Sequence, residues 1–426
     1  MPQRIVVIGS GFAGFWAALS ARRLINMRAE KGDPKAADIE VSVIAPDANL
    51  VMRPRLYEPN PANMSAPVDD VYRACGVRFV YGIVDTIRTS DHEVEMISRA
   101  GVRLTVPYEK LILAAGSRVV QPAVPGLSDF AFSVDQMEDA VKLDRHLQNL
   151  ASQPPSKARN TVVVCGGGFT GLEVATELPT RLRALFGDDA DFRVIVVDRS
   201  QNIGSDMGPG PRPHIVKVLE DLKVESKLGT SIAGIDAEGV TLSSGERIET
   251  LTAIWTAGVA ATPLTKQVSD KRDSFGRLIV DQKLRVTSVK DVFAAGDAAS
   301  ATADNCGHYA KMSCQHAGPL GRAAGNNAAA ELLGIATYSY SQPAYTICLD
   351  LGAAGAVVCK GWEPGVQYTG KEAKSVKQFI NTTLIYPPKA IAAEAFAAAD
   401  PKFDGTDPTI NYPSLKGFLH TNGIVL

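Results

Sequence analysis

The stretch RIVVIGSGFAGFWAA, residues 4–18, decides how the chain begins to fold. Ile5 to Ile8 are consecutive apolar residues, mostly β-branched, which is typical of a buried strand in a parallel sheet. Gly9 ends this strand, and Phe15 to Ile25 predict a helix. Val41 to Ala45 predict the next buried strand, so the segment is a β-α-β unit whose two strands lie parallel.

Between this strand and this helix lies the fingerprint Gly9-x-Gly11-x-x-Gly14. Gly9 allows the tight turn, Gly11 lets the backbone approach a pyrophosphate, and Gly14 lets the helix pack against the sheet. The helix N-terminus directs free N–H groups and the positive end of its dipole at the phosphates. Because the motif follows a strand and opens a helix, we interpret it as a dinucleotide-binding turn, with Phe12 and Ala13 in the same cradle.

The same order of elements occurs a second time. Thr161 to Cys165 predict a strand, residues 171–186 a helix that Pro179 should kink, and Arg193 to Val197 a further strand. Two such beginnings in one chain indicate a duplicated domain and not a solenoid. The residues of the second fingerprint that we expect to hold a dinucleotide are Gly166, Gly168, Phe169, Thr170 and Gly171.

Asp198 follows the second strand of this second unit. A carboxylate at this position accepts hydrogen bonds from a ribose 2′-hydroxyl, which favours NADH. Arg199 keeps NADPH open, because an adjacent arginine can hold a 2′-phosphate.

A third motif, Val292-Phe-Ala-Ala-Gly296-Asp297, ends another short apolar strand, and residues 111–117 read LILAAGS. Together with the two fingerprints, these stretches resemble the two-dinucleotide-fold flavoproteins, the pyridine nucleotide–disulfide oxidoreductases. The resemblance implies FAD at the first fingerprint, with Asp297 contacting its ribityl-pyrophosphate part. It further implies that FAD is lined by Val84, Ala115, Gly116 and Gly296.

Within that superfamily, residues 4–334 look most like type II NADH dehydrogenases. The stretches that carry this likeness are Pro54-x-Leu56-Tyr57-Glu58, Gly166-Gly-Gly-Phe-Thr-Gly-Leu-Glu173 and Trp255-Thr-Ala-Gly258-Val. The resemblance implies that Glu173 lies near the nicotinamide. It also implies that Gly258 lines the pocket where nicotinamide stacks on flavin.

Several positions depart from the family pattern or leave a choice open. Ala45 stands where an acid is expected, so Asp47 is the candidate for the FAD ribose. Arg53 either forms a surface salt bridge or stabilises an anionic reduced flavin. Gln315 matches the first of two glutamines on the helix at the quinone side, whereas Pro319 replaces the second.

The predicted catalytic residues are therefore Glu173, Gln315 and His316, the last as pocket lining or as a proton donor. Cys306, His308, Cys314 and His316 are residue types that suit zinc, but their spacing is unlike the usual zinc pairs, so we predict no metal site. The six cysteines include no C-x-x-C pair, and we expect free thiols.

The predicted fold class is α/β, with two Rossmann-like domains of the three-layer ββα type and a C-terminal α+β segment. The FAD domain comprises residues 1–127 and 286–335, the inserted NAD(P) domain residues 128–285, and the C-terminal segment residues 336–426. The net charge of −2 argues against nucleic-acid binding. No apolar stretch approaches the ~20 residues of a membrane span. A first strand at Arg4 leaves no room for a presequence, which favours the cytoplasm.

The sequence thus predicts an FAD-dependent NAD(P)H oxidoreductase that passes electrons to a small quinone-like acceptor. Two alternatives stay open: a flavin oxidase or dehydrogenase acting on an aromatic intermediate of specialised metabolism, and a non-catalytic FAD redox sensor. Whether the protein is a homodimer also stays open.

Overall fold

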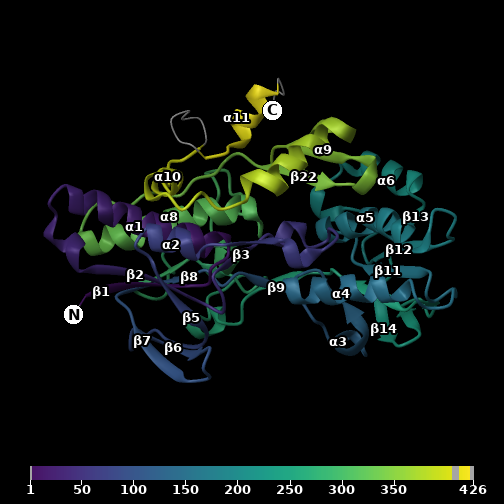
Figure 1. The fold of residues 1–426 in the computed structure, drawn as a ribbon, viewed down its shortest axis with the longest axis horizontal. Coiled ribbons are helices and arrows are strands. Elements are labelled where there is room, and N and C mark those ends of the chain that lie inside the picture. The colour runs from purple at the N-terminus through teal and green to yellow at the C-terminus, as the bar shows by residue number, and fades with distance from the viewer. Residues whose placement is uncertain (1, 405–411, 423–426) are drawn as a thin grey trace.

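The structure, a computed structural model, describes residues 2–404 and 412–422. A mainly parallel sheet and a wholly parallel sheet lie side by side, and the C-terminal segment lies above both (Figure 1). The first sheet takes its strands from residues 3–107, 110–113 and 292–294, and the second from residues 131–255. This arrangement confirms the predicted α/β class with two Rossmann-like domains. The domain limits at 127, 285 and 335 stay predictions.

The first sheet has seven strands, of which the last two in spatial order are antiparallel to their neighbours. In spatial order they are β20 (Val292–Ala294), β8 (Lys110–Leu113), β1 (Gln3–Ile8), β2 (Ile39–Ala45), β5 (Arg78–Arg88), β6 (Glu93–Ser98) and β7 (Arg103–Pro107). The carboxyl ends of the parallel strands therefore meet at one edge. One face carries α1 (Phe12–Glu30) and α8 (Cys314–Leu333), while β6 and β7 lie on the other side (Figure 1).

Helices α1 and α8 approach each other closely because small residues line their contact. A Cβ on Gly321 would lie 2.2 Å from the carbonyl oxygen of Ala13, and one on Gly325 would lie 1.9 Å from that of Ala17. Only glycine fits at these two positions without moving a backbone. The contact fixes the second turn of α8 beside the first turn of α1, so that α8 begins at the edge where the parallel strands end.

The second sheet has five parallel strands. They are β10 (Ala131–Phe132), β17 (Thr252–Trp255), β11 (Thr161–Cys165), β12 (Arg193–Asp198) and β13 (Val224–Leu228). Its helices are α4 (Met137–Leu150), α5 (Phe169–Phe186) and α6 (Arg212–Asp221). An antiparallel sheet of β14 (Ile232–Asp236), β15 (Gly239–Leu242) and β16 (Arg247–Glu249) follows, and β9 (Ser117–Val119) pairs with β18 (Val259–Ala261) where the chain passes between the domains.

The C-terminal segment packs a helix on a small antiparallel sheet, as predicted. The sheet comprises β22 (Thr346–Asp350), β23 (Ala356–Lys360) and β24 (Gly365–Thr369), and the helices are α9 (Gly370–Phe379), α10 (Ala392–Ala398) and α11 (Leu415–Thr421). A π-helical turn over Ile380–Leu384 continues α9. Strand β22 contacts α5 of the second domain, whereas α10 contacts α1 and α2 (Asp69–Ala74) of the first. The segment therefore bridges both Rossmann-like domains (Figure 1).

Residues 26–38 are polar and contain Gly32, Asp33 and Pro34, which predicts an exposed loop, but the loop is shorter in the structure. Helix α1 continues to Glu30, and a short 3₁₀ helix covers Pro34–Asp38. Arg28, Ala29 and Glu30 are good helix formers, so the helix ends only before Gly32, whose φ is +76°. Helix α5 passes through Pro179 as one element, and the predicted kink stays a prediction.

We predict that Gly325→Ala destabilises the protein while Gly318→Ala in the same helix does so far less. The added methyl group of Gly325→Ala must push α8 away from Ala17, and overpacking of this kind costs about 1–3 kcal/mol. At Gly318 the new Cβ would lie 3.4 Å from the Trp16 ring, which can adjust. Thermal unfolding of both variants measures the difference, and equal melting temperatures would contradict the close approach of α1 and α8.

Candidate functional site

The turn between β1 and α1 has the shape of a phosphate cradle. Gly9 adopts a φ of +103°, and a Cβ on Gly14 would lie 1.9 Å from the carbonyl oxygen of Gly9. By contrast, a Cβ on Gly11 would meet no atom of the described residues within 4 Å. Gly11 is the N-cap of α1 and gives the N–H groups of Phe12 and Ala13 no side-chain cap. Open space beside uncapped donors fits a pyrophosphate, as the assignment of FAD to this turn requires.

Three segments meet beside this cradle through polar side chains. Ser117 Oγ donates to Asp297 Oδ2 at 2.6 Å, and Arg53 Nη1 donates to Ser117 Oγ at 2.8 Å and to Asp297 Oδ2 at 3.3 Å. Arg53 also forms an ion pair with Asp135. Because its side chain is half-buried, Arg53 is more than a surface salt bridge: it fixes the carboxylate that the family pattern assigns to FAD.

The ends of β8 and β20 close the cradle from the other side. A Cβ on Gly296 would lie 2.8 Å from the Ala13 side chain, and one on Gly9 would lie 3.1 Å from the Cα of Ala115. Gly116 follows with a φ of +67°. These contacts bring the residues predicted from three separate motifs to one place.

Asp47 and Val84 lie at the same edge of the first sheet. Asp47 follows β2, where its Oδ1 accepts from the Asn49 amide at 3.1 Å and its carbonyl oxygen accepts from Ser10 Oγ at 3.1 Å. Ser10 belongs to the fingerprint, so Asp47 lies directly beside it. Val84 is buried on β5, beyond the part of that strand that pairs with β2. Their contacts with the ribose and the adenine stay predictions.

The second fingerprint repeats the geometry of the first. Gly166 adopts a φ of +123°, and a Cβ on Gly171 would lie 1.9 Å from the Gly166 carbonyl oxygen. Gly168 is the N-cap of α5, whose first turn contains Phe169 and Thr170. The strand, the turn and the helix N-terminus therefore form a second cradle.

Asp198 is held firmly at the end of β12. Its Oδ2 accepts from the Gly167 amide at 2.6 Å and its Oδ1 accepts from the Ser200 amide at 2.7 Å. The carboxylate is thus fixed against the fingerprint, and its contact with a ribose hydroxyl stays a prediction. Arg199 is exposed beside it. Gly258, with a φ of +77°, lies where the chain returns from β17 toward the first domain.

Glu173 lies near the start of α5 and is almost fully buried, with 4% of its surface exposed. Its carboxylate lies 2.7 Å from Lys377 Nζ and accepts from the Asp350 amide at 3.1 Å. Burial raises the pKa of Glu173 to about 7, although Lys377 opposes this shift. Burial acts to lower the pKa of Lys377, but the Glu173 carboxylate raises it above its usual value.

Lys377 is not identified as a site residue from the sequence, although the spacing of apolar residues around it indicates that it is buried. Ala373, Val376 and Lys377 form the buried stripe of α9, so a lysine stands on an apolar face. A buried cation of this kind requires a buried anion as its partner. Asp350 was also missed as a site residue; it forms an ion pair with Lys374 at 2.5 Å at the border of the same network.

The first turn of α8 carries the two other predicted catalytic residues. His316 is fully buried; its Nδ1 lies 3.1 Å from Ser313 Oγ, and its Nε2 has no hydrogen-bond partner among the described residues. Burial lowers the pKa of His316 to about 4, so the ring is neutral. The rings of Tyr345 and Trp362 lie against it, whereas Gln315 is half-buried at the rim.

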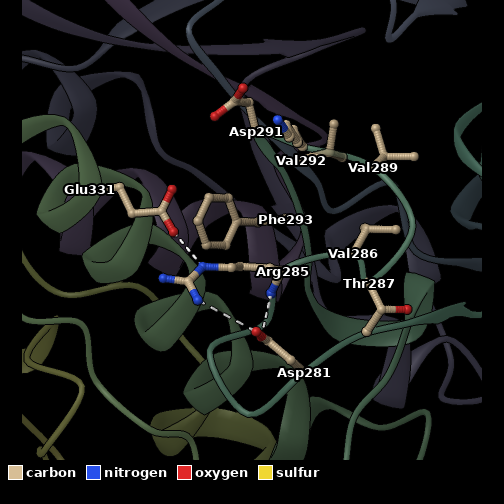
Figure 2. A pocket seen from close by; sticks show the side chains of 10 residues that line it. Asp281, Arg285, Val286, Thr287, Val289, Asp291, Val292, Phe293 and Glu331 are labelled. Carbon is tan, nitrogen blue, oxygen red and sulfur yellow. Dashed lines mark hydrogen bonds and ion pairs between the residues drawn. The ribbon is translucent and has the colours of Figure 1, made fainter.

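A groove of about 310 Å³ lies at the opposite edge of the first sheet, where β8 and β20 begin. Figure 2 shows Glu331, Arg285 and Asp281 joined by ion pairs across its wall. Asp291 in the same wall pairs with Lys110 at 2.6 Å. Ligands of open α/β sheets bind at the carboxyl ends of the strands, so we assign these paired charges to stability.

Two further observations concern the described residues as a set. Nowhere in residues 2–404 and 412–422 do three or more His, Cys, Asp or Glu side chains gather as a metal site would require. Within the same ranges, every helix is too short or too polar to cross a membrane.

The geometry can now be compared with known proteins. Residues 3–320 match the model of the pyridine nucleotide-disulphide oxidoreductase family. The chain belongs to this family. An NADH dehydrogenase-like protein of Mycobacterium tuberculosis is 45% identical over 94% of this chain and 98% of its own. A type II NADH:quinone oxidoreductase, NdhA, of the same organism is 29% identical over 69% of this chain and 66% of its own.

Solved structures support the fold at much lower identity. The sulfide:quinone oxidoreductase of Aquifex aeolicus superposes with a TM-score of 0.74, covering 100% of this chain and 96% of its own at 15% identity. NDH2 of Plasmodium falciparum in complex with NADH gives a TM-score of 0.69, covering 94% of this chain and 97% of its own at 14% identity. Both confirm the architecture of two dinucleotide-binding domains that is typical of the family.

We predict that two glycine substitutions distinguish the ligand of the first cradle from the ligand of the second. Gly11→Val fills the open space beside α1, so the purified protein should lose its flavin while remaining folded. Gly168→Val places a side chain at the N-terminus of α5, so it should retain flavin but lose nicotinamide-nucleotide binding. Visible absorption and nucleotide titration measure both properties. If Gly168→Val lost the flavin instead, the assignment of the two domains would be reversed.

Proposed function

We propose that the protein is an FAD-dependent NADH oxidoreductase that delivers two electrons to a quinone-like acceptor. The observation that carries this proposal is the pair of helix N-termini, α1 and α5, each preceded by a buried strand and a turn that only glycine can form. Each provides amide donors for one pyrophosphate. The names of the relatives, an NADH dehydrogenase-like protein and type II NADH:quinone oxidoreductases, support the same reaction class.

The residues of the first cradle would hold FAD, which when bound accepts a hydride from a nicotinamide and passes two electrons on. Asp297, fixed by Ser117 and Arg53, would bind its ribityl-pyrophosphate part. The Arg53 guanidinium, beside that site, would favour negative charge developing there. Asp198 favours NADH over NADPH as the donor, because its carboxylate would repel a 2′-phosphate.

Transfer of a hydride from NADH and reduction of a quinone to a quinol together consume one further proton, and Glu173 would deliver it while Lys377 stays charged. A carboxyl with a pKa near 7 can hold a proton and release it at working pH. Lys377 keeps the charge of ionised Glu173 compensated inside the protein. The pair lies between α5 and the C-terminal segment, on the route from the second cradle to the acceptor side.

The acceptor would approach the first turn of α8 and the C-terminal segment above it. Gln315 is accessible there, whereas His316 lies behind Tyr345 and Trp362 and would act by supporting the wall or by relaying a proton. The aromatic rings of this wall suit a planar acceptor. The cytoplasm remains our proposed location.

Stopped-flow spectroscopy tests the proposed reaction on the flavin-loaded protein. We predict rapid bleaching of the flavin absorption by NADH, slower bleaching by NADPH, and reoxidation that is fast with a water-soluble quinone and slow with air. Fast reoxidation by air would replace the proposal with a flavin oxidase. A flavin that neither nucleotide reduces would leave the redox-sensor alternative.

A second prediction concerns pH. Since the protonated form of Glu173 exists below its pKa of about 7, turnover with a quinone should fall as the pH rises through that value. Glu173→Gln should remove this inflection and lower turnover by about 10²-fold or more, as is typical for loss of a general acid. The measurement is kcat against pH at saturating NADH.

The variant Lys377→Met tests the direction in which the inflection of the pH profile moves. Lys377 lowers the pKa of Glu173, so its removal should move the inflection to higher pH. Lys374→Met removes a neighbouring lysine that pairs with Asp350 instead, and it should shift the inflection less. An unchanged inflection in Lys377→Met would show that another group titrates.

A further inference from the structure

The two cradles differ in one respect that their fingerprints do not reveal. At the second cradle, the Phe169 amide, the first N–H of α5, donates to Asp206 Oδ2 at 3.3 Å. A Cβ on Gly168 would lie 3.2 Å from the same oxygen. At the first cradle the corresponding position beside Gly11 is open. A carboxylate of the chain itself therefore lies where a pyrophosphate oxygen would bind.

The loop that carries Asp206 is anchored beside the second fingerprint. Asp206 lies in a 3₁₀ turn (Ser205–Met207) between Gly204, with a φ of +61°, and Gly208, with a φ of +74°. The Gly204 amide donates to the Gly167 carbonyl oxygen at 3.0 Å, which anchors the turn to the fingerprint. Met207 is buried, whereas Asp206 lies at the surface. Rotation of the Asp206 side chain therefore moves its carboxylate into water without unpacking the loop.

Charge makes the two occupants mutually exclusive. A carboxylate and a pyrophosphate are both anions and would use the same amide donor at the N-terminus of α5. Asp198 adds a second carboxylate nearby, while Lys311 contributes the opposing charge.

We propose that Asp206 is a displaceable cap of the second cradle, whose carboxylate satisfies the α5 amide in the free protein and must leave when a dinucleotide pyrophosphate binds. This inference rests on the proposed function, because it presumes that α5 binds NADH. The cap lowers the affinity for every ligand that carries this pyrophosphate, irrespective of the nicotinamide. It also provides an acceptor for the first amide of α5 in the free protein.

Binding of NADH and of ADP-ribose to the oxidised, flavin-loaded protein tests the cap. ADP-ribose contains the pyrophosphate but lacks the nicotinamide, so it isolates the step at α5. We expect Asp206→Ala and Asp206→Asn to bind both ligands about tenfold more tightly, because one charged hydrogen bond and one repulsion no longer oppose binding. Glu220→Gln removes an equal charge from the exposed surface of α6 and should leave both dissociation constants unchanged.

A second readout separates a cap from a residue that merely shapes the loop. Without nucleotide, Asp206→Ala should melt roughly 2 °C below the wild type, because the α5 amide loses its acceptor. Tighter binding combined with lower intrinsic stability is the expected signature. Unchanged or weaker binding of ADP-ribose in both Asp206 variants would overturn the cap. If instead wild type and variants all retained flavin but bound neither ligand, the proposed nicotinamide site itself would be wrong.

Discussion

The whole site depends on one contact made twice, between the third glycine of each fingerprint and the carbonyl oxygen of the first. At 1.9 Å from that oxygen, a Cβ on Gly14 or Gly171 cannot exist, so helix and strand approach as closely as backbones allow. The approach points the helix N-terminus along the end of the sheet. Every proposed role of α1 and α5 follows from this orientation, because an N-terminus aimed elsewhere would present its amides to water.

A second set of contacts, between helices, holds together the parts of the protein that lie outside the two fingerprints. Helix α8 is pressed onto α1 by Gly321 and Gly325, which brings Gln315 and His316 toward the first cradle. On the other side, Lys377 compensates Glu173 across the contact between α5 and α9. A buried charge without a partner is strongly destabilising, so neither element can withdraw alone. The acceptor side is thus coupled to both nucleotide-binding domains by packing and by charge.

Much of this architecture could be predicted from sequence, because the glycine spacing and the apolar strands are local signals. The β-α-β units and the order of the domains' first elements follow from such patterns, whereas the placement of Asp297, Gly296 and Gly116 at one site follows from the family resemblance. What could not be predicted depends on contacts between distant residues: Lys377 meets Glu173 only when the C-terminal segment folds over α5. Asp206 meets Phe169 only through the course of an irregular loop. Neither contact produces a residue spacing that can be recognised in the sequence.

The C-terminal segment therefore contributes more to the proposed site than its weak sequence signals suggest. The family match ends at residue 320, yet Asp350, Trp362 and Lys377 all lie beyond it. These residues face the buried carboxylate of α5 and the first turn of α8, where an acceptor would arrive. The shared part of the family fixes how two dinucleotides are held. We propose that the identity of the acceptor is encoded mainly in the part that the family model does not describe, where a buried lysine such as Lys377 can change the reaction without altering the fold.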